Sequence, residues 1–313
     1  MSGPSSNGSL RERLVVAEEV AEALAAARPV VALESTLITH GLPHPQNLEV
    51  ARAAEAAVRS EGGVPATVAI EGGRLRVGLT DAELENLAAQ PAASLMKASR
   101  PSLAAALAAH GWAGTTVSAT MLAAHAAGIS VFATGGIGGV HRGSPFDVSS
   151  DLDELARTPV VVVCAGPKSI LDVAATLEVL ETHGVPVVSL GQPNIAGFFA
   201  QDSGLAAPIV ARDEVELASL VATHLGLGLG GGMLITVPVP ADEALSPAVA
   251  EAAATTADEE AGHAGIHGHA LTPWILARIA DLTNGASVRA NRSLITNNAA
   301  VAARLASALV TSR

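Results

Sequence analysis

Only two of the eighteen basic residues in this chain are lysines, Lys97 and Lys168, and the rest are arginines. Arginine stays protonated, whereas a lysine with a depressed pKa can lose its proton and form a Schiff base with a carbonyl carbon. Lys168 lies in VVVVCAGPKSILD, where an apolar run breaks at Gly-Pro and a helix over 168–183 is predicted. The positive end of that helix dipole would disfavour the ammonium form. We interpret Lys168 as a candidate nucleophile, with an ordinary solvated lysine as the alternative.

A carboxylate and a glycine-rich stretch could complete such a site. Glu34 ends the apolar run of residues 29–33, where desolvation would raise its pKa and let it deliver a proton. The alternative for Glu34 is a glutamate satisfied by nearby backbone donors. In TGGIGGVHRGSPFDVSSDL, the glycines permit close approach to a phosphate, and His141 and Arg142 would add positive charge. Asp147 and Asp151 could bind a hard cation such as Mg²⁺ or Mn²⁺, or else cap a helix.

The elements that must position these residues alternate between strand and helix. Apolar runs predict strands at 29–33, 64–70, 75–78, 129–133, 159–165, 185–190 and 233–237. Helices are expected at 10–27, 47–60, 80–89, 101–110, 117–127, 168–183, 213–225, 242–262, 273–283 and 287–311. This order predicts a three-layer α/β/α fold with a central, mostly parallel, mixed sheet. Residues 1–9 are expected to form a disordered tail, and residues 10–313 one α/β domain. Ligands of such sheets gather at the carboxyl ends of the strands.

Composition narrows the possible partners. The net charge is −12, aromatics make up 2% of the residues and tyrosine is absent, which argues against nucleic-acid binding. No apolar run is long enough to cross a membrane, and no secretory signal is visible. The only cysteine, Cys164, cannot form a disulfide within the chain, which suits a reducing cytoplasm. We therefore expect a cytoplasmic protein with a small-molecule substrate.

A series of motifs in order identifies a family resemblance. These are ALESTLITHGLPHPQN, EGGRLRVGL, TTVSATM, ATGGIGGVHRG, FDVSSDL, VVCAGPKSILD, GVPVVSLG, GGMLITVPVP, LTPWILARI and ANRSLITNNA. Together they resemble the pseudouridine-5'-phosphate glycosidase (indigoidine synthase A-like) family over about residues 12 to 311. The resemblance implies reversible cleavage of the C–C glycosidic bond of pseudouridine 5'-phosphate to uracil and ribose 5-phosphate. The resemblance also implies a homotrimer.

The resemblance also assigns roles to residues. Lys168 would form a Schiff base with C1' of the ring-opened ribose, and Glu34 would donate the proton. Asp147 would hold Mn²⁺, largely through waters. The expected substrate contacts are Lys97, Val117, Ser149, Ser150, Asp151, His141, Asn291 and, for the phosphate, Thr134. Arginine at position 97 should damage activity, whereas arginine at position 168 should stop it.

Some features depart from the family pattern. The segment RGSPF between His141 and Asp147 is about two residues short, Val237 stands where an asparagine is expected, and residues 263–269 are rich in histidine. The asparagines near the carboxy terminus predict buried hydrogen bonds, because asparagine is a poor helix former. Two other readings stay open: a Schiff-base aldolase or lyase acting on another sugar phosphate, and a nucleotide or sugar-phosphate sensor without turnover.

Overall fold

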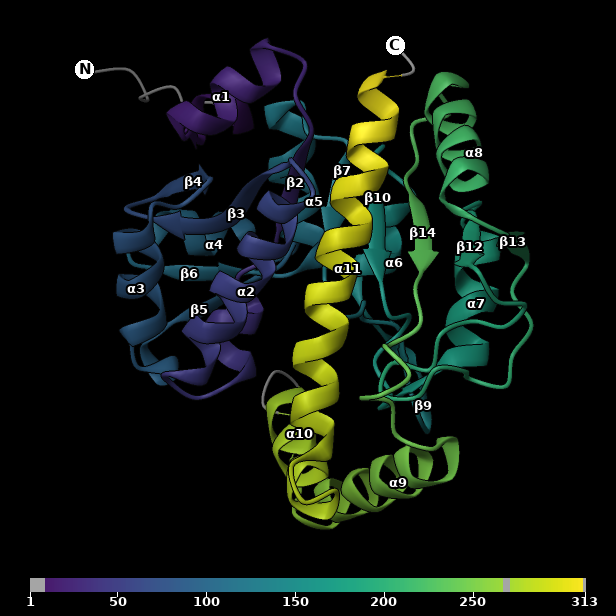
Figure 1. Cartoon of the computed structure of the whole chain (residues 1–313). Coiled ribbons are helices and arrows are strands. Elements are labelled where there is room, and N and C mark those ends of the chain that lie inside the picture. Colours follow the sequence, from purple (N-terminus) through teal and green to yellow (C-terminus); the bar gives the residue numbers. More distant parts are fainter. Residues whose placement is uncertain (1–8, 267–270, 312–313) are drawn as a thin grey trace.

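The central strands bury side chains on both faces. In Val30–Leu33 (β2), Val31 and Leu33 belong to one apolar cluster, whereas Val30 and Ala32 belong to a second cluster on the opposite face. Val161–Cys164 (β10) divides its four side chains in the same alternating way. A strand covered on both sides needs this continuous apolar composition. The computed structural model, which describes residues 9–266 and 271–311, therefore has helices on both faces of one sheet (Figure 1).

The large sheet has the order β1-β4-β3-β2-β7-β10-β14-β12-β13, with β6 beside β3 and β5 beside β6. Within the described part of the chain its ladders are parallel, except those that join β3 to β4 and to β6. The strands not yet given bounds are β1 (Leu14–Val16), β3 (Val64–Glu71), β4 (Arg74–Val77), β5 (Met96–Ala98), β6 (Ala113–Thr115), β7 (Val131–Ala133), β12 (Val187–Leu190), β13 (Ile209–Ala211) and β14 (Met233–Thr236). The expected mostly parallel, mixed sheet is confirmed.

The helices form the two outer layers. Their bounds are α1 (Glu18–Ala25), α2 (Gln46–Ser60), α3 (Asp81–Ala89), α4 (Leu103–Ala108), α5 (Val117–Ala127), α6 (Ser150–Leu155), α7 (Val173–Thr182), α8 (Glu214–Gly226), α9 (Pro247–His263), α10 (Leu271–Leu282) and α11 (Ala286–Thr311). The long helix α11 crosses one face of the sheet between α2 and α8 (Figure 1). Helices α1, α5 and α6 supply buried residues to the apolar cluster on the other face.

Two local expectations were wrong. Residues 10–27 do not form one helix, because Leu14–Val16 pairs with β4 as strand β1 and α1 begins only at Glu18. The helix expected at 168–183 begins at Val173, where Asp172 caps it by accepting a hydrogen bond from the amide of Ala175. Residues 140–148, for which the sequence predicted no element, form a hairpin of β8 (Val140–His141) and β9 (Ser144–Val148), and β8 also pairs with β11 (Leu171–Asp172).

Part of the predicted tail and of the histidine-rich segment lies outside the described residues. Of residues 1–9 the structure describes Ser9, whose amide donates to the Glu12 carboxylate at 2.8 Å. Of the histidines in that segment, His263 ends α9, whereas His267 and His269 fall outside the described ranges. Val237, the residue after β14, is buried in the apolar cluster that also contains residues of α11. Among the described helices, none combines the length and the apolar character that a bilayer crossing requires.

Candidate active site

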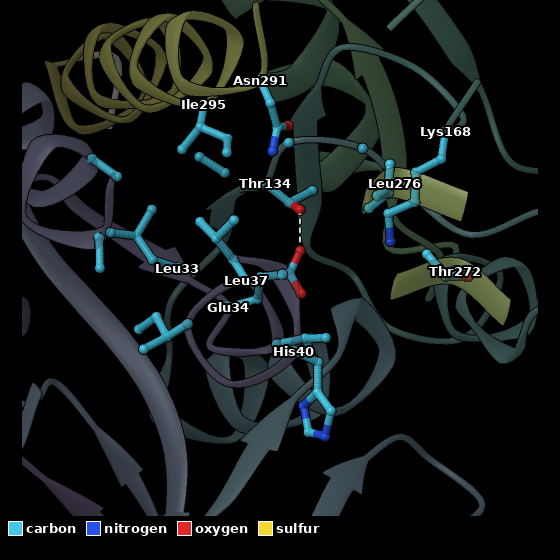
Figure 2. Close-up of a pocket in the computed structure, with 18 of the residues that line it drawn as sticks. Leu33, Glu34, Leu37, His40, Thr134, Lys168, Thr272, Leu276, Asn291 and Ile295 are labelled. Atoms are coloured by element: carbon cyan, nitrogen blue, oxygen red, sulfur yellow. Dashed lines mark hydrogen bonds between the residues drawn. The ribbon is translucent and has the colours of Figure 1, made fainter. Parts of the chain in front are cut away.

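Three neighbouring strands bring Glu34, Thr134 and Lys168 together. Glu34 follows β2, Thr134 follows β7, and Lys168 follows β10 after a turn of three residues. These strands lie side by side and parallel in the order β2-β7-β10. Their carboxyl ends therefore meet at one edge of the sheet, where α/β proteins bind ligands. Figure 2 shows the Glu34 and Lys168 side chains directed into the same cavity, with the Thr134 hydroxyl on Glu34.

Two adjoining cavities meet at this point. The smaller, about 80 Å³, is lined largely by apolar side chains such as Leu37, Leu276 and Ile295. The larger, about 580 Å³, is lined mainly by polar and charged residues. Both cavities share Glu34, Thr36, His40, Lys97, Lys168 and Thr272. An amine and a carboxyl group thus stand at the junction between an apolar chamber and a polar one.

Glu34 has the raised pKa that its strand-end position predicts. Its side chain is half-buried in the wall of the two cavities, and desolvation of the carboxyl group raises the pKa above the ordinary value. The positive charge of Lys168 and the hydrogen bond from Thr134 oppose the rise without cancelling it. A carboxyl group in this environment can keep a proton available for transfer.

Lys168 lies in an irregular turn, five residues before the first residue of α7. The helix dipole argued from the sequence therefore does not act on it as expected, because that dipole begins at Val173. The amide of Lys168 donates to the carbonyl of Ile137 at 3.1 Å, which ties the turn to the loop after β7. The second lysine, Lys97 in β5, is close enough for its pKa to be lowered by burial and by the charge of Lys168. The positive charges of the two lysines therefore act on each other across the site.

The group Ser149, Ser150 and Asp151 lines the larger cavity together with Val117. Asp151 is 5% exposed, and its two oxygens accept hydrogen bonds from the amides of Ser118 and Gly138, each at 2.9 Å. Ser149 caps α6 by accepting from the amide of Asp151 at 3.2 Å. Asp151 therefore braces the first turn of α5 against the glycine-rich loop.

Close packing explains one glycine of that loop. A Cβ atom on Gly138 would lie 2.3 Å from the hydroxyl oxygen of Ser149 and 2.9 Å from the carboxylate of Asp151. No side chain fits at that position. The sequence suggested that the glycines of this loop allow a phosphate to approach. At Gly138 the structure shows a different reason, because Ser149 and Asp151 leave no room for a side chain.

The β8–β9 hairpin carries His141 and Asp147 to the rim of the larger cavity. Asp147 is exposed, and no group of three or more histidine, cysteine, aspartate or glutamate side chains suited to a metal occurs within residues 9–266 and 271–311. One exposed carboxylate fits a hard cation held mostly by waters and substrate oxygens, and it does not fit a cage of protein ligands. Arg142, expected to add charge to the site, lines neither cavity and pairs with Glu251 instead.

Helix α11 forms part of the wall of the smaller cavity. Asn291 points into the smaller cavity (Figure 2). Asn298 is fully buried and donates to the carbonyls of Thr134 at 2.9 Å and Gly135 at 3.4 Å. The expectation of buried asparagine hydrogen bonds is confirmed for Asn298, which holds the loop that carries Thr134.

Some residues at the junction were not singled out from the sequence. His40 comes from the π-helical turn Leu37–Gly41, and its Nδ1 lies 2.7 Å from the hydroxyl of Thr39. Its place six residues after Glu34, in the same motif, was the available signal. Thr272 and Leu276 reach the cavities from α10, far along the chain, and no local pattern marks them.

The fold and the site define a three-layer α/β protein whose candidate catalytic groups stand at the carboxyl ends of adjacent parallel strands. The family model for indigoidine synthase A like protein matches residues 19–308. The chain belongs to this family.

Relatives and solved structures agree with that assignment. The chain is 52% identical over 300 residues to the pseudouridine-5'-phosphate glycosidase of Paracoccus denitrificans. The matched region covers 95% of this chain and 99% of that protein. The enzyme of the same name from Caldanaerobacter subterraneus is also 52% identical, over 93% of this chain and 95% of its own.

Two crystal structures share the fold. The prealnumycin C-glycosynthase AlnA, in complex with ribulose 5-phosphate, matches with a TM-score of 0.87 and 39% identity over 96% of this chain and 97% of its own. An indigoidine synthase A-like protein of Thermotoga maritima matches with a TM-score of 0.85 and 30% identity, over 95% and 96% respectively.

Proposed function

We propose that this chain is a pseudouridine-5'-phosphate glycosidase, which reversibly cleaves pseudouridine 5'-phosphate to uracil and ribose 5-phosphate. The observation that carries the proposal is the Lys168–Glu34 pair at the junction of the two cavities. Relatives that are 52% identical over nearly their full length bear the name of this activity, and the proposed substrate is taken from that name. An apolar chamber beside a polar one suits a molecule that joins a flat base to a sugar phosphate.

The chemistry follows from the properties of the bond. A C–C glycosidic bond cannot be broken by protonating a ring nitrogen or a bridging oxygen of the leaving group. The neutral amine of Lys168 forms a bond to C1' as the C1'–O4' bond breaks, and O4' takes a proton from Glu34. The nitrogen, now a secondary ammonium, gives a proton to the Glu34 carboxylate and so regains its lone pair. The C1'–C5 bond then breaks as this lone pair forms the iminium, and C5 of uracil takes the proton from Glu34. Water hydrolyses the iminium to ribose 5-phosphate and frees the lysine.

The remaining roles are part of the same proposal. Substrate contacts come from Lys97, Val117, Ser149, Ser150, Asp151, His141, Asn291 and Thr134. The first seven line the cavities directly, and Asp151 contributes chiefly by bracing Ser118 and Gly138. Thr134 also lines the smaller cavity, and its hydroxyl donates to Glu34, which adds a part in holding the proton donor.

We include a metal, an assembly state and a location in the proposal. Asp147 would hold Mn²⁺ through waters, and the bound ion would supply positive charge to substrate oxygens. The homotrimer is what the family resemblance implies, and the cytoplasmic location rests on the single buried thiol of Cys164, which accords with a reducing compartment.

A second candidate is C-glycoside synthesis on another acceptor. The match to a C-glycosynthase at 39% identity favours it, because a lysine iminium of a pentose phosphate could accept more than one carbon nucleophile. This candidate keeps Lys168 and changes only the occupant of the apolar chamber.

Incubation with pseudouridine 5'-phosphate and Mn²⁺, followed by chromatography, tests the function. We expect release of free uracil by the wild type, and substrate binding without release by Lys168→Ala. A wild type that binds the nucleotide but releases no uracil would favour a sensor. A wild type that releases no uracil yet couples ribose 5-phosphate to another carbon acceptor would favour the second candidate, and cleavage of a different sugar phosphate would indicate an aldolase or another lyase.

A further inference from the structure

We propose that Arg142, held by Glu251, is a positioning residue that fixes the chain segment carrying Lys168. The inference rests on the proposed role of Lys168 as the nucleophile. The Nη2 atom of Arg142 donates to the carbonyl of Ser169 at 3.0 Å, and its Nε atom donates to the carbonyl of Leu171 at 3.4 Å. One guanidinium thus spans the turn immediately after Lys168.

The opposite side of the same guanidinium is fixed to helix α9. Nη1 donates to one carboxylate oxygen of Glu251 at 2.6 Å, and Nη2 donates to the other at 2.9 Å. This bond lowers the pKa of Glu251 and raises that of Arg142, so both groups stay charged. Only the planar fork of arginine can meet two carboxylate oxygens and two carbonyls at once.

The segment needs this support because one of its sides is hollow. A cavity of about 330 Å³ lies against Pro167 and Ser169 on their α9 side, bounded also by Arg142 and Glu251. Within the described part of the chain, the buried hydroxyl of Ser169 has no hydrogen-bond partner. The segment is therefore not held there by close packing or by its own side chain.

Separate contacts hold the two halves of the segment. Upstream, the amide of Lys168 donates to the carbonyl of Ile137 at 3.1 Å. Downstream, Leu171 pairs with His141 between β11 and β8, next to Arg142 in the chain. Arg142 thus joins three parts of the molecule: the Lys168 segment, the β8–β9 hairpin and α9. Without it, we expect the segment to settle toward the hollow side and to carry the amine away from its working position.

The expected effect is on the chemical step more than on binding. A displacement of about 1 Å in a reacting group can cost about 100-fold in rate. We therefore expect Arg142→Ala to lower kcat by about 10- to 100-fold while KM changes by less than about threefold. Arg142→Lys should be nearly as slow, because a point charge cannot replace the fork.

The test compares these variants with Glu251→Gln and with Arg212→Ala. Arg212 also pairs with a glutamate, Glu216, but its side chain is 83% exposed and lies outside every contact described above. For each folded variant we would measure kcat and KM for uracil release. We would also measure the rate at which ribose 5-phosphate and borohydride label Lys168.

The proposal predicts slow release and slow labelling in Arg142→Ala, an intermediate loss in Glu251→Gln, and wild-type rates in Arg212→Ala. Rates for Arg142→Ala within about twofold of wild type, or a loss confined to KM, would overturn it. If Arg142→Ala does not fold, Glu251→Gln decides alone, and rates equal to those of Arg212→Ala overturn the proposal. A wild type that releases no uracil refutes the proposed function instead, and the labelling rates alone then decide the role of Arg142.

Discussion

Replacement of Glu34 by glutamine tests the proposed proton donor. Glutamine has nearly the same shape, and its side-chain oxygen can still accept the hydrogen bond from Thr134. The substitution therefore removes the transferable proton and leaves the neighbouring contacts in place. General acid–base catalysis contributes about 10²- to 10⁴-fold, so uracil release should fall by about that factor. Substrate binding should change little.

The pH dependence gives an independent readout of the same residue. Burial raises the pKa of Glu34, so its carboxyl group should stay protonated to a pH above its ordinary pKa of 4.5. The high-pH limb of the rate profile should report loss of that proton, and the limb should be absent from Glu34→Gln. A variant that retains release within about threefold of wild type, with the same limb, would refute the role of Glu34.

The raised pKa also predicts a stability effect. A native state that binds the proton more tightly than the unfolded chain loses stability as the pH rises from the unfolded pKa to the folded pKa. Glu34→Gln should thus match the wild type in melting temperature at about pH 4 and exceed it at about pH 8, because glutamine carries no buried charge. Equal melting temperatures at both pH values would show that the carboxylate is well solvated in the native protein.

Three further substitutions examine the surroundings of the pair. Lys97→Arg keeps a positive charge but replaces a compact, partly buried ammonium, so uracil release should fall while Lys168 can still be labelled; an unchanged kcat/KM would contradict a close contact with substrate. Thr134→Val removes a hydrogen bond that lowers the pKa of Glu34, and such a bond to a charged group contributes about 1.5–3 kcal/mol. The high-pH limb of the rate profile should therefore move to higher pH. A limb that does not move would contradict this contact. Chelation or Asp147→Asn should remove most of the activity, and Mn²⁺ should restore it only in the chelated wild type; full activity of the metal-free protein would make Asp147 structural.

The sequence predicted those parts of the fold that depend on local composition. The apolar run before Glu34 became β2, and 117–127 became α5, because periodicity and burial agree there. The strand-end position of Glu34 was enough to predict the direction of its pKa shift.

Other features depend on distant partners and escaped the sequence pattern. The helix expected from Lys168 begins at Val173, since Leu171 and Asp172 pair with β8, about 30 residues earlier in the chain. Asparagine is common at helix N-caps, but Asn47 lies inside α2, where its side-chain amide donates to the carbonyls of Ile38 and Ala88. Tertiary pairing decided the structure at these positions.

The candidate site shows the same division. Lys168 and Glu34 could be singled out by residue type and by strand ends, and the structure places both in one cavity. The bond from Thr134 to Glu34 joins residues 100 positions apart, and the bonds from Arg142 to Glu251 join residues 109 apart. No local pattern encodes such contacts, and they arise from the order of strands in the sheet and from the packing of α9.

The central claim is that Lys168 becomes covalently joined to the sugar. Incubation of the wild type with ribose 5-phosphate and borohydride, followed by mass spectrometry of its peptides, tests this directly. We predict a reduced pentose-phosphate adduct on Lys168, with none formed in Lys168→Ala. An adduct on Lys97 in place of Lys168, or an unlabelled protein that still releases uracil, would contradict the Schiff-base account.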